Sequence, residues 1–361
     1  MTEDLPAPGP ADPGPLQPRI QRALATCLGR HRASLAAMDA ALVPVADALA
    51  EFVLGGGKRL RPAFAYWGFV GAGGPDSAEL IAALAALELV HASALIHDDV
   101  IDASDTRRGE PSVHRRFADL HAARAWSGDP LAFGRASAIL LGDLCLVWSE
   151  ELLFGSGMDR AGLARARSVF DDMRTEVVVG QYLDVHAQVS ENTSMERAGK
   201  VARYKSAKYT VERPLLLGAA LAGAAEPVRA AYSGYGLPLG EAFQLRDDIL
   251  GVYGDPARTG KPAGDDLREG KRTFLVAAAA SAANPGGRAT LLAGLGDPEL
   301  DEAGVVELRA IITGTGALAR TERRIADLTR QALDALDGVE LDPEAAGVLV
   351  ELARAATQRA D

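Results

Sequence analysis

Helical periodicity recurs along this chain from about Ile20 onward, in segments separated by clusters of Gly, Pro and Asp. Apolar residues at every third or fourth position predict amphipathic helices, and no segment shows the strong apolar–polar alternation of a half-buried strand. Aromatic residues make up only 5 % of the chain while Ala and Leu are abundant, which favours helix over sheet. The sequence therefore predicts an all-α fold.

The first residues of the 361-residue chain are rich in proline and carry acids. A secretory signal would need a basic start followed by an apolar run, and neither is present there. The length alone would allow two domains or one large helical domain. We expect residues 1–18 to be a disordered tail and residues 19–361 to form a single all-α domain.

Charge, cysteine content and hydropathy exclude several classes of protein. The net charge of −11 argues against a general nucleic-acid binder. Two distant cysteines, Cys27 and Cys145, give neither a disulfide framework nor a zinc pattern, so we expect a protein of the reducing cytoplasm. The most apolar stretch that we identify, residues 215–225, is well short of the ~20 residues of a spanning helix, and we expect no integral membrane segment.

A first acidic motif ends the predicted helix over residues 79–102. Asp98, Asp99 and Asp102 fall within about 100° of helical arc, at the helix end where the macrodipole disfavours negative charge. Carboxylates on a shared face suit Mg²⁺. The following Arg107 and Arg108 are placed to grip a phosphate. The alternative is a solvated acidic helix end followed by unrelated surface arginines.

A second acidic motif follows about 150 residues later. Gln244, Asp247 and Asp248 share one face of another predicted helix, and the loop after it carries Lys261 and Lys271. Two such faces opposed across a helical bundle would form a multi-metal site with a basic rim. A site of this kind suits an ionising diphosphate leaving group.

Further cations stand near the start of the chain, where Lys58, Arg59 and Arg61 follow three glycines. Glycines let the backbone approach an anion closely, but the spacing of a Walker loop is absent. Taken alone, this cluster is a weak signal.

Two polar groups in the middle of the chain have alternative interpretations. Lys205 and Ser206, in YKSAKY, belong either to an ordinary basic helical face or to an anion site. Gln181 and Asp184 share a predicted helical face, either as a polar pair in the core or as support for the site.

Five motifs, in the right order, resemble those of the trans-isoprenyl diphosphate synthases, the polyprenyl synthetase family. They read GGGKRLRP, HASALIHDDVIDASDTRRG, GQYLD, YKSA and FQLRDDILGVYGDPARTGKPAGDDLREGKRT. The resemblance is close over residues 40–280 and looser beyond. It implies an isoprenoid synthase-type helical bundle around a deep central cavity, usually as a homodimer, with Mg²⁺ bound at both aspartate motifs to hold an allylic diphosphate.

The resemblance also implies roles for individual residues. The metal ligands would be Asp98, Asp99, Asp102, Asp247 and Asp248. The groups around the allylic diphosphate would be Arg107, Lys205, Ser206, Gln244, Lys261 and Lys271. The pocket for isopentenyl diphosphate would contain Lys58, Arg61, His91 and Arg108. Catalysis would be by charge stabilisation and would rest on Asp98, Asp99, Asp102, Arg107, Lys205, Asp247 and Lys261. Two positions depart from the family pattern, because Gly251 replaces the third acid of the second motif and Ser206 replaces a threonine.

Product length in this family depends on the residues below the first motif. Bulky aromatics four or five residues before the first aspartate stop growth at farnesyl diphosphate, and the corresponding residues here are the small Ala94 and Ser93. Leu87 lies further down the same predicted face. We therefore expect geranylgeranyl diphosphate as the product, with a longer polyprenyl chain as the second expectation, unless a bulky side chain from a neighbouring helix closes the tunnel.

Three rival functions are considered. Glu88-x-x-His91 has a spacing used by di-iron helical bundles, although we find only one such motif. A class I terpene cyclase shares the metal-triggered ionisation but would not need the second set of cations. A non-catalytic partner subunit should have lost acids or lysines that are nearly complete here.

Overall fold

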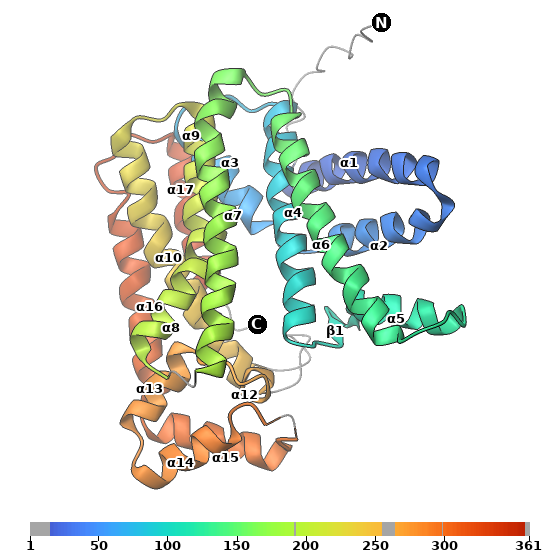
Figure 1. Cartoon of the computed structure of the whole chain (residues 1–361). Helices are drawn as coiled ribbons and strands as arrows, with labels where there is room; N and C mark the ends of the chain where they lie inside the picture. The colour runs from blue at the N-terminus through green and yellow to red at the C-terminus, as the bar shows by residue number, and fades with distance from the viewer. Residues whose placement is uncertain (1–14, 191–192, 255–263, 298, 358–361) are drawn as a thin grey trace, which may run out of the picture.

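The computed structural model describes residues 15–190, 193–254, 264–297 and 299–357 (Figure 1). Most of these residues are helical. The one sheet within these ranges is a two-stranded antiparallel pair, β1 (Thr106–Arg107) with β2 (Glu110–Pro111). The all-α prediction is confirmed.

In the described residues, the first half of the chain forms eight helical elements, and α4 contacts every other α-helix among them. They are α1 (Leu16–Met38), η1 (Ala40–Leu42), α2 (Val43–Leu54), α3 (Leu60–Gly71), α4 (Ala78–Ile101), α5 (Val113–Ala123), α6 (Pro130–Phe154) and α7 (Arg160–Val189). Figure 1 shows α1 and α2 projecting to one side of the long helices.

The second half completes the bundle. Its helices are α8 (Met195–Val201), the π-helix η2 (Ala202–Glu212), α9 (Arg213–Ala222), α10 (Glu226–Tyr253), α12 (Asp265–Arg268), α13 (Phe274–Ala282), α14 (Pro285–Gly294), α15 (Glu302–Gly314), α16 (Ala317–Asp334) and α17 (Pro343–Thr357). In Figure 1, α7, α10 and α16 run roughly along one direction, and α14 and α15 lie across the end of the bundle.

The first helix begins earlier than expected. Helix α1 starts at Leu16, so residues 16–18 are helical rather than part of a disordered tail. Pro18 is compatible with this start, because the backbone N–H groups of the first turn have no partner within a helix in any case.

Helix α4 is the central helix of the core. All eight residues 83–90 are buried, so the helix has no solvated side along this stretch. A helix that is apolar all round is enclosed by its neighbours, as α4 is by α1, α3 and α6. This enclosure places the carboxylates at its C-terminal end inside the molecule.

Two of the described helices, α4 and α6, are long and apolar enough to cross a bilayer by length and composition alone. They are longer than the apolar stretch of residues 215–225, so the sequence expectation overlooked two better candidates. Most of α4 is buried within the protein, whereas α6 is less covered. The absence of a membrane segment remains a prediction.

Helices α3 and α9 approach each other closely where glycines meet backbone. A Cβ on Gly218 would lie 2.0 Å from the carbonyl oxygen of Ala65, and a Cβ on Gly68 would lie 2.6 Å from that of Leu215. These atoms cannot move aside as a flexible side chain would. The two helices therefore pack backbone to backbone.

We expect Gly218→Ala to lower the free energy of unfolding by about 2–3 kcal/mol, because the added methyl group overpacks this crossing. The matched control is Gly347→Ala within α17, where a Cβ meets no atom within 4 Å. That change should be neutral or stabilise by about 0.5–1 kcal/mol. Urea denaturation of both variants checks the prediction, and equal effects would contradict it.

Candidate active site

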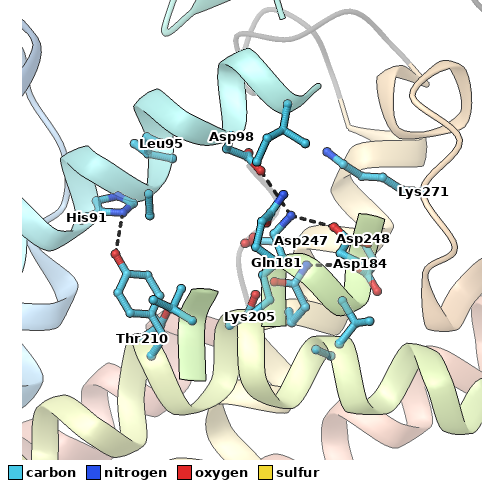
Figure 2. Close-up of a pocket in the computed structure, with 18 of the residues that line it drawn as sticks. His91, Leu95, Asp98, Gln181, Asp184, Lys205, Thr210, Asp247, Asp248 and Lys271 are labelled. Carbon is cyan, nitrogen blue, oxygen red and sulfur yellow. Dashed lines mark hydrogen bonds and ion pairs between the residues drawn. The ribbon is translucent and has the colours of Figure 1, made fainter. Parts of the chain in front are cut away.

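A cavity of about 980 Å³ opens between α4, α7, η2 and α10 (Figure 2). Its apolar lining includes Val90, Ala94, Leu95, Leu146, Val177 and Phe243. Its polar lining includes the predicted residues Lys58, Arg61, His91, Asp98, Arg107, Lys205, Ser206, Gln244, Asp247, Asp248 and Lys271. The fold thus brings motifs from distant parts of the sequence to one cavity.

Two carboxylates of the first motif face lysines. Oδ1 of Asp98 lies 3.3 Å from Nζ of Lys205, and Oδ2 of Asp102 lies 3.9 Å from Nζ of Lys271. Burial opposes ionisation of Asp98, but the charges of Lys205 and Lys271 outweigh it and lower the pKa of Asp98. Burial and the charge of Asp98 raise the pKa of Asp102 to about 6. Asp98 therefore loses its proton more readily than an ordinary aspartate, whereas Asp102, one helical turn later, loses its proton less readily.

Asp99 departs from the predicted arrangement. It is 1 % exposed, and its Oδ1 accepts hydrogen bonds from Nε and Nη2 of Arg107, the first at 2.8 Å. About 100° of helical rotation separates it from Asp98, which is enough to turn it toward the loop after α4. Asp99 thus anchors Arg107, and the metal-ligand role predicted for it has no support in this geometry.

The second motif presents Asp247 and Asp248 from α10. Oδ1 of Asp248 accepts a 2.8 Å hydrogen bond from Nε2 of Gln244. Burial raises the pKa of Asp248 to about 8, against the effect of this hydrogen bond, and the charges of Asp266 and Asp247 raise it further. A Cβ on Gly251 would lie only 1.8 Å from Oδ2 of Asp266. Asp266 therefore fills the space into which the missing third acid would project.

Lys205 lies between the two sides of the cavity (Figure 2). Its Nζ donates to Oδ2 of Asp184 at 2.7 Å and to Oδ1 of Asp98 at 3.3 Å. Burial disfavours the charge, but the two carboxylates outweigh it and raise the pKa of Lys205. Asp184 thus supports the site, which was one of its two interpretations.

Lys271 is held in the same way on the opposite side. Its Nζ lies 3.3 Å from Oδ1 of Asp266 and also pairs with Glu269. The carboxylates outweigh burial and raise its pKa well above the usual value. Lys261, predicted to act beside it, lies outside the described residues.

Lys205 and Ser206 belong to η2, whose i to i+5 hydrogen bonding is typical of functional sites. Glycines of the neighbouring helices make room for this helix. A Cβ on Gly180 would lie 2.3 Å from the backbone nitrogen of Lys205, and one on Gly240 would lie 2.5 Å from Cα of Ala207. Sequence periodicity could not reveal the π-helix, since it presumes the α-helical repeat.

Three predicted residues, Lys58, Arg61 and Arg108, form what we call the N-terminal cation cluster, and the predicted His91 lies beside it. Nη2 of Arg61 donates to Oγ1 of Thr210 at 3.0 Å, and its guanidinium lies 4.2 Å from the ring centre of Tyr209. The Tyr209 hydroxyl lies 3.3 Å from Nδ1 of His91. Burial and the charge of Arg61 hold the pKa of His91 well below its usual range, so His91 is neutral at pH 7.

The residues expected to control product length divide into two groups. Ser93 and Ala94 line the cavity, as predicted. Leu87 does not belong to that lining, because it is completely buried in the core that encloses α4. The tunnel therefore does not follow the face of α4 as far down as the helical wheel suggested.

Comparison with known proteins decides the family. The polyprenyl synthetase family model matches residues 44–312. The chain belongs to the polyprenyl synthetase family. Its activity is that of a trans-prenyltransferase, which replaces the di-iron interpretation of Glu88. Oε2 of Glu88 accepts a hydrogen bond of 2.5 Å from Nη1 of Arg59.

Individual relatives agree with this family assignment. The chain is 32 % identical to a short chain isoprenyl diphosphate synthase of Methanothermobacter thermautotrophicus, over 80 % of this chain and 83 % of that protein. It is also 32 % identical to a geranylfarnesyl diphosphate synthase of Aeropyrum pernix, over 80 % of this chain and 86 % of the relative. A solved geranylgeranyl pyrophosphate synthase of Corynebacterium glutamicum, complexed with isoprenyl diphosphate and magnesium, superposes with a TM-score of 0.92 and 43 % identity over 95 % of this chain and 98 % of that one.

The polyprenyl synthetase site offers carboxylate oxygens, the ligands that Mg²⁺ prefers. In the described residues, no three His, Cys, Asp or Glu side chains converge as a ready-made metal site. The carboxylates of the two motifs fit Mg²⁺, which usually takes one or two carboxylates and completes its shell with water and phosphate oxygens. Burial, with the charges of neighbouring carboxylates, raises the pKa values of Asp102 and Asp248.

Sequence reasoning missed several residues of this site. Tyr209 and Thr210 reach the cavity because they follow Lys205 on the π-helix. Asp266 reaches it from α12. Its one sequence signal was the Gly-Asp-Asp run after the lysine loop, since this places a spare acid near the incomplete second motif.

We expect Asp248→Asn to raise the free energy of unfolding by about 1–2 kcal/mol at pH 8 without metal. The folded protein keeps the Asp248 proton up to about pH 8, whereas the unfolded chain loses it near pH 4. Wild-type stability therefore falls as pH rises through this window, and the asparagine variant avoids that loss.

Urea unfolding from pH 5 to 8.5 measures this effect, with Asp337→Asn at an exposed position as control. The gain of Asp248→Asn should grow with pH, and the variant should lose the stabilisation that Mg²⁺ with diphosphate gives the wild type. A gain that stays constant over this pH range would contradict the assignment.

Proposed function

We propose that the protein condenses isopentenyl diphosphate with an allylic diphosphate, in the presence of Mg²⁺, to form geranylgeranyl diphosphate. The allylic substrate would be dimethylallyl, geranyl or farnesyl diphosphate. The observation that carries this proposal is the meeting of two carboxylate motifs at one end of a cavity whose adjoining wall is apolar and small at Ser93 and Ala94.

The allylic diphosphate would bind between the two aspartate motifs. Asp98, Asp102, Asp247 and Asp248 are the residues that would hold Mg²⁺, which when bound supplies positive charge to the diphosphate oxygens. Lys205 lies beside Asp98 and adds a fixed charge there. As the bond from the allylic carbon to oxygen breaks, charge develops on the leaving diphosphate, and prepositioned cations stabilise it.

The second substrate would bind at the N-terminal cation cluster. Lys58 and Arg61 would hold the diphosphate of isopentenyl diphosphate, and the neutral His91 would contribute a hydrogen bond. The alkene of isopentenyl diphosphate attacks the allylic cation and forms the new carbon–carbon bond. The departing diphosphate then takes the proton that the product must lose, so no side chain is assigned as a base.

Product sizing tests the proposal. Purified protein is incubated with Mg²⁺, labelled isopentenyl diphosphate and each allylic diphosphate in turn, and the dephosphorylated alcohols are sized. We expect geranylgeraniol from the wild type and shorter alcohols from Ala94→Phe, because the ring would close the cavity one turn below Asp98. Unchanged products from Ala94→Phe would contradict the tunnel assignment.

The same assay separates the rival activities. A longer alcohol would indicate a polyprenyl diphosphate synthase with an open tunnel. Release of diphosphate with a cyclic hydrocarbon would indicate a terpene cyclase. A folded wild-type protein that elongates no starter would indicate a partner subunit and would overturn the proposal.

We also propose that two copies form a homodimer through α6 and α7. Helix α6 exposes Ile139, Leu140 and Val147, and helix α7 exposes Val178, Val179, Tyr182 and Val189. Helix α6 packs on α4 and α5, and α7 packs on η2 and α9, while the residues named above stay exposed. Val178 and Tyr182 also line the cavity, and a second copy over them would complete its wall. Exposed apolar surface of this kind marks interaction sites.

We expect Leu140→Arg to convert the dimer to a monomer in light scattering, because it buries a charge in the proposed interface. Val306→Arg on α15 is the matched control, since both residues are 62 % exposed. The control should keep the wild-type mass. A Leu140→Arg variant that also keeps it would place the interface elsewhere.

Finally, we propose that the protein works in the cytoplasm. This proposal is supported by Cys27 and Cys145, which are both buried free thiols.

A further inference from the structure

Arg59 points away from the cavity that its neighbours line. Lys58 and Arg61 both line the cavity, whereas Arg59 is not part of the lining and is only 6 % exposed. Arg59 precedes the first residue of α3 and has a φ of 50°, a conformation that costs energy for a residue other than glycine. A strained backbone of this kind persists only when the surrounding contacts impose it.

Three contacts hold the Arg59 guanidinium. Its Nη1 donates to Oε2 of Glu88 at 2.5 Å. Its Nη2 donates to the carbonyl oxygen of Val53 and to Oε1 of Gln21, both at 2.7 Å. Arg59 therefore links the end of α2, helix α1 and the middle of α4.

Glu88 is 4 % exposed and lies one turn before His91 on α4. A buried carboxylate needs a charged partner, and Arg59 is the one that the structure provides at hydrogen-bond distance. Burial and repulsion by Arg59 lower the pKa of Arg108, and the negative charge of Glu88 partly opposes this shift.

The glycine loop above this ion pair is tied down at its backbone. Nη1 of Arg108 donates to the carbonyl oxygen of Gly56 at 3.1 Å, and Nε2 of Gln17 donates to that of Gly57 at 3.0 Å. Gly56 and Gly57 have φ values of 110° and 124°, so the loop path depends on glycine and on these contacts. Lys58 follows directly on this path.

We infer that the buried Arg59–Glu88 ion pair positions the N-terminal cation cluster for the second diphosphate without touching it. The contacts of Arg59 fix the end of the glycine loop. Lys58 before it and Arg61 after it thereby face the cavity. Glu88 fixes Arg59 and offsets its charge among the cations. This inference rests on the proposed function, because it assigns that cluster to isopentenyl diphosphate.

The test is Glu88→Gln, which keeps the shape of the side chain and removes its charge. We expect the KM for isopentenyl diphosphate to rise about tenfold, while the KM for the allylic diphosphate stays within twofold of the wild type. The Kd for isopentenyl diphosphate alone, measured by calorimetry, should rise by the same factor. A merely structural role would instead change both KM values together.

Asp76→Asn is the matched control. Asp76 pairs with the buried Arg19 at 2.8 Å and links α1 to the start of α4, at the opposite end of that helix from the cavity. It should lower the melting temperature without separating the two KM values. If Glu88→Gln does not fold, Arg59→Lys replaces it, because a lysine keeps the charge but cannot reach all three partners in a fork.

Two results distinguish the inference from the proposed function. A wild-type protein that elongates no allylic diphosphate would overturn both. A wild-type protein that elongates normally, with a folded Glu88→Gln or Arg59→Lys variant whose KM for isopentenyl diphosphate is unchanged or shifts equally with the allylic KM, would overturn the inference alone.

Discussion

Carboxylates at the buried end of a central helix set the main electrostatic constraint on this protein. Helix α4 has no solvated side over residues 83–90, and Asp98, Asp99 and Asp102 stand at its C-terminal end, where its dipole also disfavours negative charge. Each acid therefore lies near a cation from another segment. Asp98 faces Lys205 of η2, and Asp102 faces Lys271 from the segment before α13. Asp99 pairs with Arg107 from the segment after α4.

The negative charges of Asp102 and Asp248 remain unfavourable, because burial and neighbouring carboxylates raise the pKa values of both groups. A bound metal ion would bring positive charge to these carboxylates, so their unfavourable charge in the free protein would favour metal diphosphate binding. The free protein holds its lysines among the acids, and a diphosphate would give those lysines a second partner. Stability and binding therefore oppose each other at the same side chains.

Sequence predicted the helices and the two aspartate motifs because both depend on local spacing. Sequence did not predict several contacts that join distant segments. Asp99 pairs with an arginine from a loop, Asp266 fills the place of a missing acid, and Leu87 packs into the core. The wheel angle of Leu87 was known, but which neighbouring helices cover that face depends on tertiary packing. Arg59 and Glu88, 29 residues apart, gave no signal as a pair for the same reason.

The glycine crossing of α3 and α9 fixes the spacing between two helices that lead to the two proposed diphosphate sites. Helix α3 begins beside Lys58 and contains Arg61, while α9 continues directly from η2, which carries Lys205. Where backbones touch, the spacing between helix axes cannot drift with side-chain rotamers. If the two diphosphates bind as proposed, the distance between them, and with it the approach of the carbons to be joined, would be set by main-chain atoms rather than by side-chain rotamers.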